Sequence, residues 1–277
     1  MPILDDHMHL RPEGKGVEAL KEFERAGGTH VILCHLPYKG VKIKIGRDFR
    51  KQYQISLDLA EKCRRETSVK VYVMLGPYPG HVAWLWDSLG PEATLQAMNE
   101  GMEIAAELVR EGKALGIGEI GRPHFPVSPE IWAASNETMK LGMRLAKEAG
   151  CTVQLHTESA GPEVWKELAE MADSVGLARE KVVKHYSGPA ILESENHGLF
   201  PSVLSSKDNI IAAANKGSRF MMETDFIDDP RRPGAVFAPA TVPKRTKAML
   251  EAGIFTEETA AKVHGEWPGK IYGIDME

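Results

Sequence analysis

Short runs rich in Val, Ile and Leu alternate along the whole chain with longer segments that have helical periodicity. We predict strands at 2–7, 30–35, 70–75, 115–119, 152–156, 181–185, 199–205 and 219–225. A strand that is buried on both faces is apolar along its length, and Val31-Ile32-Leu33 shows this pattern. Repeated strand–helix units of this kind predict a parallel sheet that is covered by helices.

Eight strand–helix units in 277 residues match the size of an α/β barrel, which typically takes ~250 residues. We therefore expect one (β/α)8 TIM barrel that forms a single domain over residues 1–277. Helices between residues 242 and 273 are expected to pack outside the barrel. Ser128-Pro129 and Gly150 have the residue types that begin and end helices. The seventh unit is predicted to have a short helix, because few residues separate His185 from Leu199.

Composition limits the location and the partners of the chain. It is 43% hydrophobic and 26% charged, as ordinary globular proteins are, and it has no apolar run of ~18 residues that would span a membrane. Its first residues lack the basic and apolar regions of a signal peptide, and its three scattered cysteines argue against a disulfide framework. We expect a cytoplasmic protein with no membrane contact and no obligate protein partner. A net charge of −5 argues against broad electrostatic binding to nucleic acid.

Histidines and acidic residues stand at the predicted carboxyl ends of five strands, where barrel enzymes place their chemistry. They are His7, His9, Glu119, His156, His185 and Asp225. Residues two apart on a strand face the same side, so His7 and His9 can reach one point. Imidazole and carboxylate groups suit one or two divalent ions, Zn, Mn or Mg. We expect the glycines at 118 and 121 to leave room for a ligand to approach the backbone.

These motifs, in this order, resemble a known family. His-x-His at 7–9, Gly-Glu-Ile-Gly at 118–121, Leu-His at 155–156, His-x-Ser-Gly at 185–188 and Glu-Thr-Asp at 223–225 are similar to the motifs of the TatD-related branch of the amidohydrolase superfamily. The similarity covers nearly the whole chain. It implies that His7 and His9 bind one ion and that His156 and His185 bind a second. Glu119 would bridge the two ions, and Asp225 would hold the first ion and the attacking water.

Such a site fits hydrolysis with two metal ions. Two cations ~3.5–4 Å apart need a shared anionic ligand, and Glu119 would supply it. A water between the ions would lose its proton near neutral pH, and Asp225 would take or shuttle that proton as general base. Glu119 and Asp225 are thus the predicted catalytic residues. The leading prediction is a phosphoesterase of the TatD-like deoxyribonuclease type that acts on a small-molecule or oligonucleotide phosphate.

The residues predicted to bind substrate lie where the chain departs from the family pattern. Gly76-Pro77-Tyr78-Pro79 carries Tyr78 where TatD-type nucleases commonly have histidine, and Arg122-Pro123 replaces the usual Leu-Asp. These departures indicate a divergent branch, of an archaeal type. The forked donors of Arg122 match a phosphate or carboxylate. Lys39 and Lys42 begin a basic segment that either holds substrate phosphates or forms a solvated helix face.

Two other functions fit parts of the pattern. An amidohydrolase or lactonase would cleave a small cyclic amide, amide or lactone. Binuclear enzymes of that kind usually bridge their ions with a modified lysine on strand four, where this chain has Glu119. A non-catalytic ligand-binding descendant would be expected to have lost one or more of the six ligands, and none is missing.

Overall fold

The computed structural model of the chain describes residues 1–159, 161–232 and 236–277. Its strands form one sheet with the order β8-β7-β6-β5-β4-β3-β2-β1-β9, and every pair of neighbours is parallel. The strands are β1 (Leu4–His9), β2 (His30–Cys34), β3 (Lys70–Leu75), β4 (Gly116–Gly121), β5 (Thr152–His156), β6 (Val182–Lys184), β7 (Phe200–Leu204), β8 (Met221–Glu223) and β9 (Phe226–Ile227). All eight predicted strands are confirmed.

The sheet curls back on itself where its last strands meet the first. β9 follows β8 directly and pairs with β1. The backbone N–H of Asp225 donates to the carbonyl of His7 at 3.0 Å, and the N–H of Thr224 donates to Asp5 Oδ1 at 3.0 Å. The carboxyl ends of the strands therefore come together on one side of the barrel, here called the top face.

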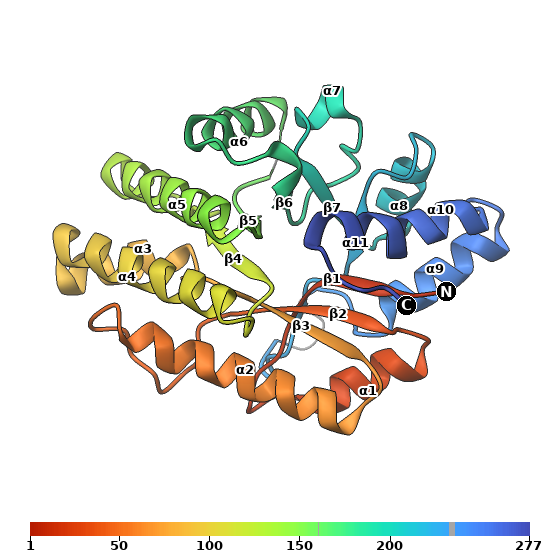
Figure 1. The fold of residues 1–277 in the computed structure, drawn as a ribbon, viewed down its shortest axis with the longest axis horizontal. Helices are drawn as coiled ribbons and strands as arrows, with labels where there is room; N and C mark the ends of the chain where they lie inside the picture. The colour runs from red at the N-terminus through yellow and green to blue at the C-terminus, as the bar shows by residue number, and fades with distance from the viewer. Residues whose placement is uncertain (160, 233–235) are drawn as a thin grey trace.

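Helices alternate with the strands and cover the outer side of the sheet (Figure 1). They are α1 (Val17–Arg25), α2 (Asp48–Glu66), α3 (Gly80–Leu89), α4 (Pro91–Arg110), α5 (Pro129–Ala149), α6 (Pro162–Val175), η1 (Arg179–Lys181), α7 (Glu193–Asn196) and α8 (Lys207–Ala214). The predicted ends of α5 are confirmed, because the Ser128 side chain accepts a hydrogen bond from Ile131 N and Gly150 is left-handed at φ 67°. The helix of the seventh unit is a single turn, as predicted.

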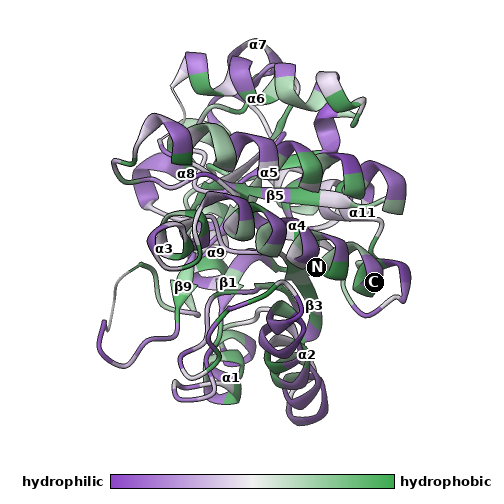
Figure 2. Ribbon diagram, turned by 90° about the vertical axis from the view of Figure 1, so that its left-hand side faces the viewer, coloured by the Kyte–Doolittle hydropathy of each residue, from purple (hydrophilic) through white to green (hydrophobic). Residues whose placement is uncertain are grey.

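Apolar side chains fill the space between the helices and the sheet. Phe23 of α1, Phe49 of α2 and Trp165 of α6 are all almost fully buried. Figure 2 shows the outward turns of α2 as hydrophilic and β5, in the interior, as hydrophobic. Each helix turns its apolar side to the sheet and its polar side to solvent, which fixes the orientation of the helix. The orientation of the helices in turn fixes which loops reach the top face.

The C-terminal residues form α9 (Thr241–Glu251) and then a continuous run of α10 (Glu257–Ala261), η2 (Lys262–Glu266) and α11 (Trp267–Tyr272). They pack outside the barrel wall, as predicted, and α11 lies at the end opposite the top face. There the carbonyl of Ile271 accepts from Thr152 Oγ1 at 2.7 Å. Tyr272 is the exception to outside packing, because its hydroxyl reaches Gln154 of β5 at 2.7 Å inside the barrel.

Two expectations from composition can be compared with the described part of the chain. The three cysteines are free and buried. None of the helices described combines the length and apolar character needed to cross a membrane.

Candidate metal centre

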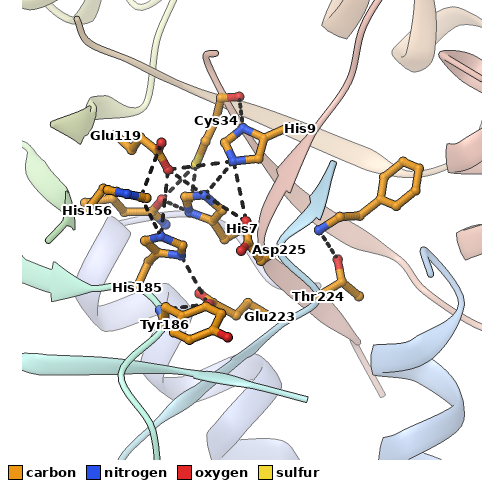
Figure 3. Close-up of polar contacts among 12 residues, drawn as sticks. His7, His9, Cys34, Glu119, His156, His185, Tyr186, Glu223, Thr224 and Asp225 are labelled. Carbon is orange, nitrogen blue, oxygen red and sulfur yellow. Dashed lines mark hydrogen bonds and ion pairs between the residues drawn. The ribbon is translucent and has the colours of Figure 1, made fainter. Parts of the chain in front are cut away.

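Two strands are irregular where they carry candidate ligands. β1 has one residue more than β2 within 5–8, and β4 has one residue more than β5 within 117–120. Such bulges redirect side chains and are common beside active sites. The irregular stretches contain His7 and Glu119, whose side chains meet below the top face (Figure 3).

His7 and His9 each direct Nε2 to the centre, because Nδ1 is held from behind. Gln154 Oε1 accepts from His7 Nδ1 at 2.9 Å, and Gln154 is oriented by its Nε2, which donates to the carbonyl of Asp6 at 2.8 Å. The carbonyl of Cys34 accepts from His9 Nδ1 at 2.9 Å. With Nδ1 held in this way, Nε2 of both rings faces the centre, and in the neutral ring this nitrogen is the one that would bind a metal ion.

His185 and His156 form a second pair of imidazoles. His185 Nδ1 lies 3.2 Å from Glu223 Oε1, which places its proton on Nδ1 and leaves Nε2 facing His156 Nδ1 at 3.1 Å. The other nitrogen of His156 is 2.6 Å from Nδ1 of His124. Burial holds the pKa of His185 well below its ordinary value. The neutral form of His185, which can act as a ligand, is therefore favoured.

Glu119 lies between the two pairs. Its Oε2 is 3.0 Å from His7 Nε2 and 3.7 Å from His9 Nε2. Its Oε1 is 3.5 Å from His156 Nδ1, and its Oε2 is 3.8 Å from His185 Nε2. Burial opposes ionisation, but His156 and His7 together hold the pKa of Glu119 well below its usual value. Glu119 is therefore a carboxylate in contact with both pairs.

Asp225 stands beside the first pair. Its Oδ1 is 3.6 Å from His9 Nε2 and 3.9 Å from His7 Nε2, and its side chain is 12% exposed, against 3% for Glu119. The backbone of Asp225 is left-handed, with φ 49°, a conformation that is uncommon outside glycine and often marks functional sites. The carboxylate of Glu119 is thus enclosed, and the carboxylate of Asp225 reaches solvent.

The donor set fits a divalent cation. Lone pairs on buried nitrogens and a carboxylate repel one another unless a cation lies between them. Glu119 Oε2 is buried and accepts no hydrogen bond from the residues that the structure describes, so this oxygen is available as a ligand for a cation. The structure has three groups of donors that lie within 4.8 Å of one another: His7, His9 and Asp225 in one, Glu119, His156 and His185 in another, and His7, His185 and Glu223 in a third. All six residues predicted as ligands are brought together.

The glycines around Glu119 have a packing role between strands, and the room that they leave for a ligand stays a prediction. A Cβ on Gly121 would lie 2.0 Å from the carbonyl oxygen of His156, and a Cβ on Gly118 would lie 2.9 Å from Gln154 Cβ. Both contacts are with β5. The glycines therefore allow β4 and β5 to approach closely, which sets the spacing of Glu119 and His156.

Arg122 does not offer its donors to a substrate in this structure. The side chain is buried, and its five N–H groups bond to Glu158 twice, Glu167 twice and Asn136 once. Its guanidinium also lies 4.4 Å from the ring centroid of Trp132. The sequence could not reveal this, because the two glutamates follow Arg122 by 36 and 45 positions. Arg122 ties the end of β4 to α5, α6 and the loop after β5.

The other residues predicted to bind substrate are placed differently. The ring of Tyr78 is 5.6 Å from the ring of His156, so Tyr78 borders the centre. Lys39 and Lys42 are exposed in the loop between β2 and α2. Contact of these two lysines with a substrate stays a prediction.

Sequence reasoning missed the residues that hold the ligands from behind. Gln154 stands two positions before His156, and Glu223 two positions before Asp225, so the period of a strand could have found them. His124 lies in the loop after β4 and belongs to none of the sequence motifs. Tyr272 had no signal in the sequence, because its contact with β5 depends on where α11 packs.

Comparisons with known proteins add to this geometry. A family model described as TatD related DNase matches residues 4–273. An uncharacterized protein of Methanocaldococcus jannaschii is 39% identical over 284 aligned residues, which cover 100% of this chain and 98% of the relative.

Two solved structures show the same fold. The phosphotriesterase homology protein of Escherichia coli, complexed with phosphate in its active site, has a TM-score of 0.69 at 15% identity over 98% of both chains. A TatD-like protein of Archaeoglobus fulgidus has a TM-score of 0.65 at 18% identity, over 98% of this chain and 100% of that one. The predicted barrel architecture is confirmed.

Proposed function

Because this chain belongs to the TatD related DNase family, we propose that it is a metal-dependent hydrolase that cleaves phosphodiesters, as a TatD-like deoxyribonuclease would. The observation that carries the proposal is the enclosed carboxylate of Glu119, surrounded by four imidazoles and without a hydrogen bond at Oε2 among the described residues. A hydrolytic metal centre explains both features together.

The six candidate ligands would have different roles in such a centre. His7, His9 and Asp225 would hold one divalent ion, His156 and His185 would hold a second, and Glu119, which lies between the two pairs of imidazoles, would be a ligand that they share. Bound Zn, Mn or Mg would supply the Lewis acidity that activates a water for attack. Asp225 would accept the proton of that water, because it is the carboxylate that reaches solvent. The buried supports of the imidazoles keep their lone pairs aimed inward while the reaction proceeds.

The residue at the bridging position favours phosphodiester cleavage over cleavage of amides or lactones. Binuclear lactonases and amidohydrolases usually carry a modified lysine there, on strand four, whereas β4 of this chain carries Glu119. The buried Lys184 lies on β6, and it donates to the carbonyl of His185 at 2.6 Å. The alternative is decided by a substrate panel. Purified protein is analysed for bound metal and then assayed on phosphodiesters and single-stranded DNA in parallel with lactones and amides. Turnover of lactones or amides alone would reject the proposal.

Asp225→Asn separates metal binding from proton transfer. The asparagine keeps the shape and one oxygen ligand but cannot accept the proton, so we expect most metal to be retained and kcat to fall roughly 10²–10⁴-fold. Asp208→Asn, on the exposed first turn of α8, is the matched control and should leave kcat unchanged. Near-normal turnover by Asp225→Asn on the best substrate of the panel would exclude Asp225 as the base.

A further inference from the structure

One buried arginine joins the carboxyl ends of β4 and β5. The backbone N–H of Arg122, the first residue after β4, donates to the carbonyl of His156, the last residue of β5, at 3.0 Å. The guanidinium donates twice to Glu158 of the loop after β5, at 2.9 and 2.6 Å, and twice to Glu167 of α6, at 2.9 Å each. Arg122, Glu158 and Glu167 are here called the arginine clamp. None of the three is a candidate ligand, so the proposed reaction does not account for the clamp.

The arginine clamp is held firmly on the outer side of the sheet. A bidentate pair between a guanidinium and a carboxylate fixes the orientation of both groups, and the fully buried Arg122 forms two such pairs. Asn136 accepts the remaining N–H at 3.1 Å, and the Trp132 ring packs against the guanidinium. Both residues belong to α5, which packs against β4 and β5, while α6 packs against α5 (Figure 1). The clamp therefore fixes the end of β4 relative to both helices.

His156 is the candidate ligand that the arginine clamp adjoins. Its carbonyl accepts from Arg122 N, and Glu158 follows it by two positions, so the clamp holds its backbone on both sides. Its ring is held as well, because His156 Nε2 lies 2.6 Å from Nδ1 of His124. His124 is exposed and follows Arg122 by two positions, so the clamp also sets where the loop after β4 carries this imidazole. The other ring nitrogen of His156 faces the centre.

His7 and His9, in contrast, are held from inside the barrel. Gln154 accepts from His7 Nδ1 and the carbonyl of Cys34 accepts from His9 Nδ1. These supports come from the middle of β5 and the end of β2, whereas the arginine clamp lies outside the sheet. The two halves of the candidate metal centre therefore have separate supports. Loss of the clamp should displace His156 while His7 and His9 keep their places.

We propose that Arg122 is a positioning residue for His156, so that the arginine clamp decides whether the centre binds two metal ions or one. This inference rests on the two-ion centre of the proposed function. Residues of a metal or catalytic site must be held within about 0.5 Å of their productive geometry. A strand end that is free to shift would move His156 beyond that tolerance and weaken the second ion position. The first ion position does not use His156 and would be retained.

The test counts the Co²⁺ ions bound by the chelated full-length protein, by titration calorimetry and by visible absorption, without substrate. We expect the wild type to bind two ions. Arg122→Met should weaken the second ion about tenfold or more and the first by less than about twofold, as loss of an outer support of one ligand does. Glu158→Gln should act in the same direction while Arg122 stays in place, which keeps the test decisive if Arg122→Met does not fold.

Two further variants separate positioning from stability. Glu167→Gln also removes a charged partner of Arg122, but it lies on α6 and not beside His156, so it should weaken the second ion less than Glu158→Gln does. Asp173→Asn is the matched control on the same helix. It removes a bidentate pair with Arg179, at 3.0 and 2.6 Å, and should change the affinity of neither ion.

Three outcomes would overturn the proposal. They are a single ion in the wild type, equal weakening of both ions by Glu158→Gln, and wild-type affinity for both ions in Glu158→Gln. Equal effects of Glu158→Gln and Glu167→Gln on the second ion would also overturn it, because the clamp would then support α6 and not His156. Selective loss of the second ion in a protein that cleaves no phosphodiester would support this inference and reject the proposed function.

Discussion

Replacing Gln154 by methionine tests whether the metal centre is held from inside the barrel. The side chain accepts from His7 Nδ1 at 2.9 Å and from Cys34 Sγ at 2.8 Å. It donates to the carbonyl of Asp6 at 2.8 Å and to Tyr272 Oη at 2.7 Å. Methionine has nearly the same volume and makes none of these hydrogen bonds. The substitution therefore removes polar contacts while leaving little cavity.

The expected effect on metal affinity follows from the bond to His7. Loss of the partner that orients a histidine ligand typically weakens metal binding ~10–100-fold. Because His7 Nδ1 would lose its amide acceptor and keep only the Cys34 Sγ atom 3.3 Å away, its ring could rotate or change tautomer, and Nε2 would be less firmly fixed toward Glu119. We expect a loss in this range, measured by titration calorimetry of the chelated protein with Zn or Mn.

Tyr272→Phe is the matched control. It removes one bond of Gln154 but keeps the bond between Gln154 and His7, so we expect metal affinity to change only a few-fold. The free energy of unfolding should still fall by about 1–2 kcal/mol, because a buried donor loses one acceptor. Wild-type metal affinity in Gln154→Met, with folding intact by circular dichroism, would refute the claim that Gln154 orients His7.

Three further predictions concern stability. Arg122→Met should lower the free energy of unfolding in urea by about 3 kcal/mol, because Glu158 and Glu167 lose a buried cation, and a loss below about 1 kcal/mol would contradict this. Burial lowers the pKa of His264 from 6.5 to about 4, so the folded state excludes a proton that the unfolded state binds as the pH falls below 6.5. From pH 7.5 to 5 this group should cost about 2 kcal/mol of stability, and His264→Gln should lack that part of the decline. Metal at ~100 times its Kd should stabilise the chelated protein by about 2.7 kcal/mol, and equal melting temperatures with and without chelator would argue against a metal site in the folded state.

The barrel was predictable because its signals are local. Apolar runs, helix-capping residues and strand length are read over a few positions, and each predicted strand overlaps an observed one. The meeting of the six candidate ligands followed from one further rule, that parallel strands bring their carboxyl ends to the same face.

The assignment of Arg122 to substrate shows where local reading fails. Its residue type suits a phosphate, and nothing near it in the chain indicates otherwise. Its charge is taken by Glu158, in the loop after β5, and by Glu167 of α6, which only the fold brings to the end of β4. Tyr78 and Trp84 are separated by six positions, yet the approach of their rings to 5.4 Å between centroids depends on the absence of a side chain at Gly80.

The sequence alone therefore determined the order of strands and helices, the chemical types of the candidate ligands and the face on which they gather. These depend on residue type and periodicity, which are properties of the chain itself. Only the tertiary structure decided how the ligands are aimed and which charges remain available. The bulges at His7 and Glu119, the entry of Tyr272 into the barrel and the neutralisation of Arg122 arise from contacts between distant segments. Their free energies depend on packing, which no local pattern encodes.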